Sequence, residues 1–318
     1  MKQLQLIIVL VSCFPALGYS QIHFLIPGGA GGGWDRTARA VGQVLIDTKL
    51  VSSATYENMS GGGGARGIAH TIEKNDPNLL LINSTPIVVR SLQNFLPQTY
   101  KDLTPIASVI GDYSVVVVRN SSPFNTLAEF LGAWRNSPRM YPVAGGSVVG
   151  GTDHIFAALL ARSQKINPVQ IKYIPYDAGG KAMAGLLSGE VAILSSGYGE
   201  VMDLEQQGWV RILCIAAPLR IDSARSIPTC TEAGALGVEF VNWRGFFTAP
   251  NVSRERAEEL SNLLKQMTLT DEWRQTRDRY GWVSLFRPGV QFQRLLDKQA
   301  SELSILLADL GLIKGRSN

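Results

Sequence analysis

Short apolar segments alternate with longer amphipathic segments along most of this chain. The short segments are rich in Val, Ile and Leu, and several are apolar at every position rather than at every second one. That pattern is typical of strands buried on both faces, and it predicts a parallel β-sheet with helices on both sides. The predicted strands are Ile22–Pro27, Leu79–Asn83, Ser114–Arg119, Tyr141–Ala144, Ile171–Tyr176, Val191–Ser195 and Arg211–Ala216.

The segments between these strands repeat apolar side chains every three to four residues, as amphipathic helices do. The predicted helices are residues 35–49, a segment after Gly67, and residues 152–163, 253–268, 270–280 and 290–310. We expect Asp35 to cap the first helix. Gly281 and Gly311 are expected to end the last two helices in the left-handed conformation. Alternating strands and helices place the chain in the α/β class.

Residues 1–20 have the features of a secretory signal peptide. One lysine precedes an apolar stretch that is too short to span a bilayer comfortably. Gly18 and Ser20 occupy the positions that signal peptidase reads, so we expect cleavage before Gln21 and export to the periplasm. The segment ending at Cys13 also fits a lipoprotein box, and the mature chain would then be anchored through a lipid on that cysteine.

Composition and charge exclude several classes of protein. Apolar residues make up 45% of the chain and charged residues 18%, so the chain can bury a core and disorder is not expected. The net charge of +4 includes no run of like charges, so we expect no nucleic-acid partner. Cys214 and Cys230 are the cysteines that follow the leader. Export permits a disulfide between them, and two separate buried thiols are the alternative.

Three glycine-rich turns, residues 27–35, 60–67 and 144–154, each separate a predicted strand from a predicted helix. Glycine lets the main chain approach a ligand closely. The helix that follows presents unpaired N–H groups and a partial positive charge, which suit a carboxylate or a phosphate. A single such turn could serve chain geometry alone, but three turns at the carboxyl ends of strands favour a binding site.

Enzymatic and cofactor-binding motifs are incomplete in this sequence. Gly62, Gly64 and Gly67 fit a dinucleotide fingerprint, but no acidic residue ends the next strand to hold a ribose hydroxyl. Ser147 lies in a segment that lacks the last glycine of a hydrolase nucleophile elbow. A Ser147–His154 pair would have no evident acid to orient the histidine. The sequence also has no spaced set of metal ligands, so we expect neither a cofactor nor a metal.

Six segments resemble, in the same order along the chain, the periplasmic substrate-binding proteins of tripartite tricarboxylate transporters, the TctC or Bug-type family. They are IHFLIPGGAGGGWD (22–35), ENMSGGGGARG (57–67), YKDLTPI (100–106), GGTDH (150–154), YIPYDAGGKAMAGLLSG (173–189) and IPTCTEAGALG (227–237). The resemblance covers essentially all of the mature chain. It implies a two-lobed flytrap, the type II periplasmic-binding-protein fold, with the ligand in a cleft between the lobes.

The two lobes implied by this resemblance would divide the chain into three parts. Residues 21–118 and 245–318 are expected to form the first lobe, and residues 119–244 the second. The sequence contains no low-complexity linker, so strands should join the lobes. The tracts Tyr113–Asn120 and Val241–Pro250 are the expected crossings.

The resemblance also implies a function without catalysis. The chain would be a monomeric receptor that captures a small carboxylate, a di- or tricarboxylate, and passes it to a membrane permease. In this family the first glycine-rich turn and the G-T-x-x-H turn bind one carboxylate from opposite lobes, largely through hydrogen bonds from main-chain N–H groups. The residues that this points to are Gly28, Gly29 and Asp35 from the first lobe and Ser147, Gly151, Thr152 and His154 from the second. Thr85 and Tyr198 complete the expected site, Tyr198 as a specificity residue.

Two residues depart from the family pattern. Gly28 stands where the family often has a larger residue, which would widen that wall of the cleft. Glu200 would repel a third carboxylate unless it faces away or pairs with a cation. Two other functions remain open on the sequence alone. They are a periplasmic sensor that reports ligand occupancy to a membrane kinase, and an exported hydrolase that uses Ser147.

Overall fold

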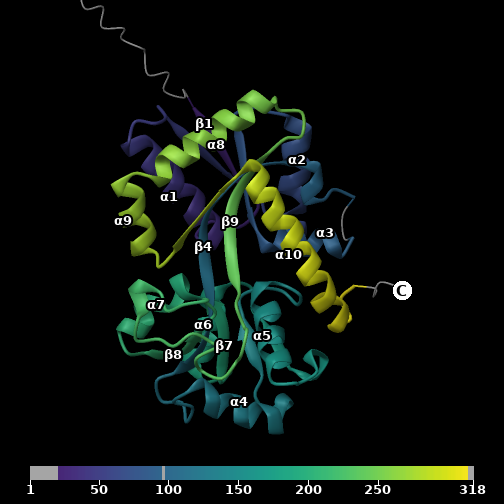
Figure 1. The fold of residues 1–318 in the computed structure, drawn as a ribbon, viewed down its shortest axis with the longest axis vertical. Helices are drawn as coiled ribbons and strands as arrows, with labels where there is room; N and C mark the ends of the chain where they lie inside the picture. Colours follow the sequence, from purple (N-terminus) through teal and green to yellow (C-terminus); the bar gives the residue numbers. More distant parts are fainter. Residues whose placement is uncertain (1–20, 95–96, 314–318) are drawn as a thin grey trace, which may run out of the picture.

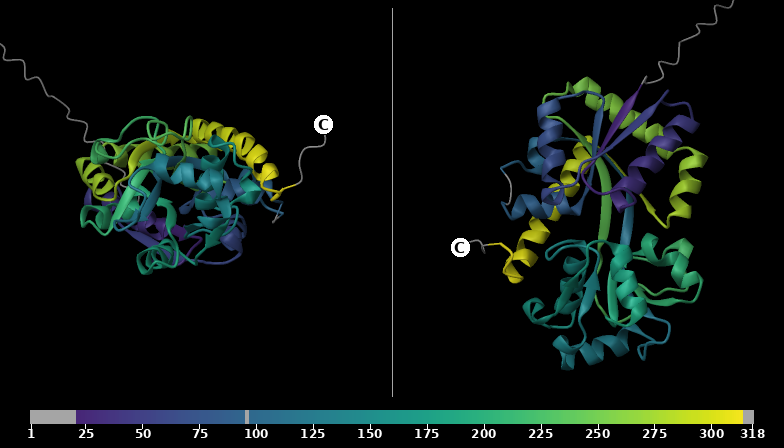
Figure 2. Two further views of the ribbon diagram at one scale, coloured as in Figure 1. Left: turned by 90° about the horizontal axis from the view of Figure 1, so that it is seen from below. Right: turned by 180° about the vertical axis from the view of Figure 1, so that it is seen from behind.

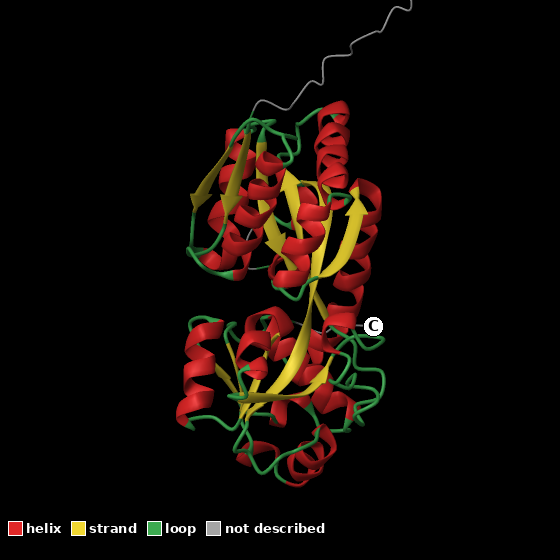
Figure 3. Ribbon diagram, turned by 90° about the vertical axis from the view of Figure 1, so that its left-hand side faces the viewer, coloured by secondary structure: helices red, strands yellow, loops and turns green. Residues whose placement is uncertain are grey.

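The computed structural model describes residues 21–94 and 97–313. The predicted signal peptide and Cys13 lie outside the described residues. The chain forms two α/β lobes, one above the other in Figure 1, and the predicted fold class is confirmed. Seen from the side in Figure 3, long strands pass from one lobe to the other. Within the described ranges, no helix is both long enough and apolar enough to cross a membrane.

The first lobe is a mixed sheet covered by six helices. Its strands are β1 (Ile22–Ile26), β2 (Ala54–Asn58), β3 (Leu79–Ser84), β9 (Val241–Thr248), β10 (Val283–Pro288) and the first part of β4 (Thr104–Arg119). Its helices are α1 (Gly33–Asp47), α2 (Ala65–Lys74), α3 (Thr85–Leu92), α8 (Arg254–Thr268), α9 (Asp271–Arg279) and α10 (Gly289–Asp309). Gly281 and Gly311 have φ angles of 65° and 68°, the left-handed conformation that the sequence predicted after α9 and α10.

The second lobe is smaller. Its strands are β5 (Val143–Gly145), β6 (Tyr173–Pro175), β7 (Ile193–Gly197), β8 (Val210–Ile215) and the last part of β4. Its helices are α4 (Leu127–Asn136), α5 (Thr152–Ser163), α6 (Gly179–Ser188) and α7 (Tyr198–Gln206). Short 3₁₀ turns lie at Gly62–Gly64, Tyr100–Asp102, Pro138–Met140, Pro168–Gln170 and Asp222–Ala224.

The predicted all-parallel sheet is wrong, because β4, β9 and β10 pair with antiparallel neighbours. β1, β2 and β3 are parallel to one another, and so are β5, β6 and β7. β9 pairs antiparallel with β3 and β4, and β4 pairs antiparallel with β7 and β8. The fully apolar segments correctly predicted strands that are buried on both faces. Burial on both faces, however, does not determine strand direction.

β4 joins the two lobes and changes partners at one point. Up to Tyr113 it pairs with β9, and from Ser114 it pairs with β7. The returning chain runs beside it, where the Ser114 N–H donates to the Phe240 carbonyl oxygen at 3.2 Å. The chain therefore crosses between the lobes at Ser114, inside the predicted tract Tyr113–Asn120, and at Phe240, next to the predicted tract Val241–Pro250. The lobe boundaries at residues 118/119 and 244/245 stay predictions.

Two further contacts tie distant segments together. Cys214, in β8, forms a disulfide with Cys230, and both residues are completely buried. The alternative of two separate thiols is therefore not observed. From the first lobe, α10 runs down beside the second lobe (Figures 1 and 2). There Asp309 pairs with Arg162 of α5 across 3.5 Å.

Candidate ligand-binding cleft

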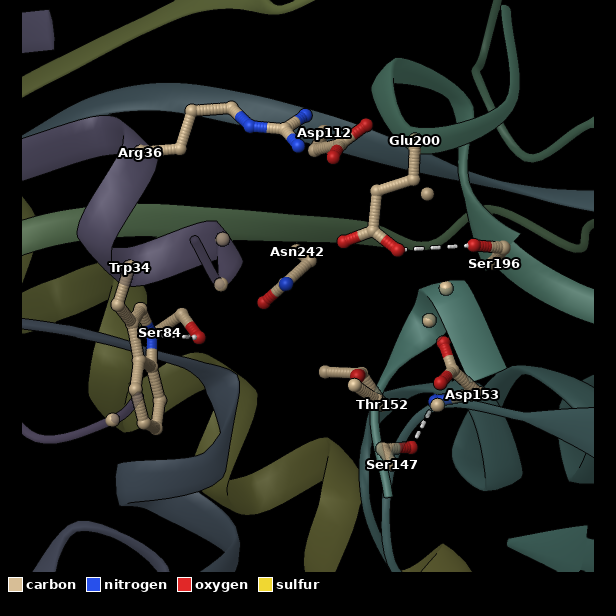
Figure 4. A pocket seen from close by; sticks show the side chains of 18 of the residues that line it. Trp34, Arg36, Ser84, Asp112, Ser147, Thr152, Asp153, Ser196, Glu200 and Asn242 are labelled. Carbon is tan, nitrogen blue, oxygen red and sulfur yellow. Dashed lines mark hydrogen bonds between the residues drawn. The ribbon is translucent and has the colours of Figure 1, made fainter. Parts of the chain in front are cut away.

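A cavity of about 930 Å³ opens between the lobes, and residues of both lobes line it. The glycine-rich turn at residues 28–33 forms the first-lobe wall. Residues 146–147, 152–153, 177–180, 196–197 and 200–201 contribute to the second-lobe wall. Arg244 of β9 also lines the cavity, close to the crossing between the lobes. Asp112 of β4 and Asn242 of β9 lie at the same place (Figure 4). A cavity of this size and composition is typical of small-molecule binding sites.

The first glycine-rich turn leads directly into α1, which begins at Gly33 with Gly32 as its N-cap. Asp35 is therefore the third residue of the helix and not the N-cap that the sequence predicted. Its carboxylate accepts a hydrogen bond from the Gly31 N–H at 2.9 Å and others from Arg39 and Asn58. Burial alone would raise the pKa of Asp35, but these hydrogen bonds and the charge of Arg39 hold it below its usual value. The ionised Asp35 carboxylate therefore holds the glycine-rich turn in place through hydrogen bonds.

Arg244 places a buried positive charge at the start of α1. Its side chain is 5% exposed, and it donates to the Thr37 hydroxyl at 3.0 Å and to Asp112 Oδ2 at 3.4 Å. A Cβ atom on Gly33 would lie 2.7 Å from Arg244 Nη2, so only glycine lets the guanidinium lie against the first turn. The charge of Arg244 and the unpaired N–H groups of that turn therefore act at the same end of the helix.

Trp34 occupies the space that Gly28 leaves open. A Cβ atom at Gly28 would lie 3.0 Å from Trp34 Cε3. The indole Nε1–H donates to the Ser84 hydroxyl at 3.0 Å, which fixes the ring in the cleft wall (Figure 4). The expected widening at Gly28 is therefore offset by a side chain six residues further along the chain.

In the second lobe, the third glycine-rich turn folds around the side chain of Asp153. Interactions with the Ser147 hydroxyl and with the N–H groups of Ser147 and Gly146 lower the pKa of its carboxyl group. The Asp153 N–H in turn donates to Ser147 Oγ at 3.0 Å. Burial raises the pKa of Asp153 to about 7, and the nearby charge of Glu200 raises it as well.

Glu200 lies in the first turn of α7, and its carboxylate points into the cavity (Figure 4). It accepts a hydrogen bond from the Ser196 hydroxyl at 3.2 Å. Asp112, at the crossing, accepts one from the Gly199 N–H at 3.1 Å and pairs with Arg244. Burial raises the pKa of Asp112 to about 6; Arg244 lowers it and Glu200 raises it. Glu200 therefore raises the pKa of both Asp112, which is buried, and Asp153, which is half-buried.

Comparisons with known proteins identify the family of proteins in which this cleft between two lobes occurs. The family model described as "Tripartite tricarboxylate transporter family receptor" (TctC) matches residues 38–311. The chain belongs to the TctC family. It is therefore a solute-binding receptor of this transporter class, and membership of the family implies a location outside the cytoplasm.

Individual TctC-like proteins resemble the chain at modest identity. A UPF0065 protein of Agrobacterium vitis is 25% identical over 250 residues, which cover 77% of this chain and 70% of that protein. A Rhodopseudomonas palustris protein solved with adipate has a TM-score of 0.82 at 20% identity, and covers 92% of this chain and 97% of its own. MatC of the same species, solved with malate, has a TM-score of 0.78 at 20% identity, with coverages of 92% and 100%. These structures share the fold.

Four of the residues expected in the TctC site line the cavity. They are Gly28 and Gly29 of the first lobe and Ser147 and Thr152 of the second. Asp35 does not line it, because its side chain points back into the turn that it braces. These positions agree with glycine-rich turns from opposite lobes facing one another.

The structure does not bring the other expected residues into the cleft lining. Gly151 is the buried N-cap of α5, and His154 Nδ1 accepts a hydrogen bond from the Gly150 N–H while its ring stacks on Tyr173. Burial lowers the pKa of His154 to about 4, so the ring is neutral. Thr85 is fully buried and accepts a hydrogen bond from Gln299. Tyr198 packs in the second-lobe core, because the first residue of α7 faces inward.

Sequence reasoning missed Arg36, Asp112, Asp153 and Arg244 as cleft residues. Asp112 and Arg244 were detectable as charges inside otherwise apolar strands, and Asp153 as an acidic residue directly after Thr152. Among the residues that the structure describes, no cluster of His, Cys, Asp and Glu side chains could hold a metal ion.

Proposed function

We propose that this receptor captures a small organic carboxylate in the periplasm and delivers it to the membrane permease of a tripartite tricarboxylate transporter. The observation that supports this most directly is Arg244, whose guanidinium lies against the N-terminus of α1. A carboxylate at the glycine-rich turn would receive main-chain hydrogen bonds beside a buried cation. The malate and adipate of the two R. palustris structures are acids of this class.

The receptor would act by reversible capture without chemistry, as a monomer. The lobes are joined by neighbouring strands at Ser114 and Phe240, which can act as a hinge. A ligand held by both walls stabilises the closed arrangement through its higher affinity for that arrangement. The closed receptor would then be the form that docks on the permease.

The two alternative functions have less support. A sensor role would need a kinase partner, whereas the family is one of transporter receptors. A hydrolase would need Ser147 activated by a base. Ser147 instead bonds with Asp153 and Tyr173, and the only hydrogen bond described for His154 Nδ1 comes from the Gly150 N–H.

Replacement of Gly33 by alanine tests the proposed site. The new Cβ would displace the Arg244 guanidinium from the start of α1, because that side chain is held by Thr37 and Asp112 and has little room. We expect Gly33→Ala to weaken carboxylate binding by about tenfold, the loss of one charge-assisted contact. Isothermal titration calorimetry with the carboxylate that best raises the melting temperature measures this loss.

Gly132→Ala is the matched control. Gly132 is not among the residues that line the cavity; it lies in α4, at the end of the second lobe away from the first lobe (Figure 1), and a Cβ there meets nothing within 4 Å. Its carboxylate affinity should equal that of the unaltered receptor. A screen in which no carboxylic acid binds the unaltered receptor would refute the proposed function, and equal affinities for both variants would refute the role given to Arg244.

A further inference from the structure

The two walls of the cleft carry opposite charge. On the first-lobe side, α1 presents its positive end, Arg36 lines the cavity with an exposed side chain, and Arg244 lies behind Gly33. On the second-lobe side, Asp153 and Glu200 line the cavity. Asp112 lies between the walls and is paired with Arg244. Asp177 also lines the second-lobe side, but Lys181 pairs with it at 3.1 Å.

The second-lobe turn already has a carboxylate of the protein beside it. The N–H groups of Gly146 and Ser147 interact with the Asp153 carboxylate and lower its pKa. A ligand carboxylate approaching this turn would therefore meet a carboxylate of the protein where the family resemblance implied main-chain donors. Glu200, which points into the same part of the cavity, adds a second negative charge (Figure 4). Like charges at such short range oppose binding unless a cation lies between them.

Asn242 adds a further acceptor beside the cleft. The side-chain oxygen Oδ1 of Asn242 is buried and has no hydrogen-bond partner among the described residues. Asn242 lines the cavity between the first-lobe turn and Glu200 (Figure 4). A buried acceptor without a donor is costly. Because Oδ1 is buried, a donor group of the ligand can reach it only when the amide turns toward the cavity.

We propose that the ligand is an amino-carboxylate whose carboxylate lies against the glycine-rich turn of the first lobe and whose protonated amine lies against Glu200 and Asp153. This inference rests on the proposed function, because it keeps the first-lobe carboxylate site and adds the chemistry of the opposite wall. The ammonium group places a positive charge between the Glu200 and Asp153 side chains that line this wall. The structure therefore favours a zwitterion over the di- or tricarboxylate expected from the sequence.

Calorimetric titration with matched pairs of acids tests the proposal. Each pair has similar length and differs in whether the far end is a carboxylate or an amine: glutarate with 4-aminobutyrate, and adipate with 5-aminopentanoate. Aspartate and glutamate extend the series to α-amino acids. We expect at least one amino-carboxylate to bind more tightly than both glutarate and adipate, the acids without an amine. Glu200→Gln should weaken that amino-carboxylate by about five- to tenfold, since one partly exposed ion pair is lost.

Two further variants separate the possible outcomes. Asp203→Asn removes the same charge from α7 at an exposed residue outside the cleft lining, and it should leave the affinity unchanged. Glu200→Lys should reverse the preference and favour the dicarboxylate of each pair. Tighter binding of dicarboxylates by the unaltered receptor, or an affinity that Glu200→Gln does not change, overturns the proposed ligand class but not the carboxylate receptor. If none of the acids binds, the proposed function falls, and the ligand class with it.

Discussion

Asp153 is a half-buried acid at the cleft, and its protonation should be linked to folding. Its carboxyl has a pKa of about 7 in the folded receptor, against an ordinary value of 3.8. The folded state therefore holds a proton that the unfolded chain releases between about pH 4 and pH 7. Protonated Asp153 stabilises the fold fully below that window, and this contribution is lost as the pH rises through it.

Replacement of Asp153 by asparagine should remove this pH dependence. We expect Asp153→Asn to gain stability over the unaltered receptor as the pH rises from 5 to 8, because the variant has no charge to bury. Urea unfolding midpoints of both proteins at pH 5 and pH 8 measure the difference, and carboxyl groups common to both cancel. A difference that stays constant with pH would show that Asp153 ionises as freely in the folded state as in the unfolded chain.

The sequence predicted the two turns that form the cleft, but not the charges between them. Glycine-rich segments can be found locally, and so Gly28, Gly29, Ser147 and Thr152 were placed in the lining. The contact between Asp112 and Arg244 joins residues 132 positions apart. Only the pairing of β4 with β9 brings them together, and no local pattern specifies that pairing.

At the scale of elements, the start of α6 packs directly on the third glycine-rich turn. A Cβ atom on Gly146 would lie 2.2 Å from the Gly179 nitrogen, and the backbone of Ala178 is also within 2.6 Å. The main chains of the two turns therefore touch, which places both in the second-lobe wall. A clash with main chain cannot be relieved by rotation of a side chain.

Gly146→Ala should therefore destabilise the second lobe. We expect a loss of more than about 2 kcal/mol in the free energy of unfolding, at the upper end of the cost of overpacking. Gly180→Ala, in the first turn of α6, is the control, since a Cβ there meets nothing within 4 Å. That variant should keep or slightly raise the stability. Equal urea midpoints for the two variants would contradict this view of the contact.

Strands were predicted best where burial was greatest. β1, β3 and β7 are buried along nearly their whole length, and continuous apolar sequence identified them. β10 was not predicted as a strand, because its residues are half-buried or exposed and its sequence, VSLFRP, mixes apolar and polar side chains. Helices α8 and α9 were predicted within a residue or two, since Ser253 and Thr270 cap their first turns. Strand direction was not predictable, because it is set by contacts distant in sequence.

At the scale of the whole molecule, the lobes share structure rather than a flexible linker. β4 pairs with strands of both lobes, and the Ser114 and Phe240 main chains are hydrogen-bonded where the lobes meet. α10 adds the contact between Asp309 and Arg162. Loss of either lobe would leave half of β4 without partners.

We therefore expect the receptor to unfold in a single cooperative transition. Tryptophans report on each lobe separately, Trp134 in the second and Trp273 in the first, and both are buried. With phenylalanine replacing the other tryptophans, the fluorescence of either reporter should give the same urea midpoint as circular dichroism. Two separate midpoints would indicate that the lobes are independent, and β4 would then not couple them.

The pairing of β9 between β3 and β4 also dictates an order of assembly. The strands β1 to β3 leave the ribosome long before β9, and the entire second lobe is made in between. Residues of β3 such as Ile82 find their partner in Phe246 only after that lobe has been synthesised. A compact second lobe brings the ends of this long insertion together, which lowers the entropy cost of closing it. The part of the chain that begins first is thus the part that finishes folding last.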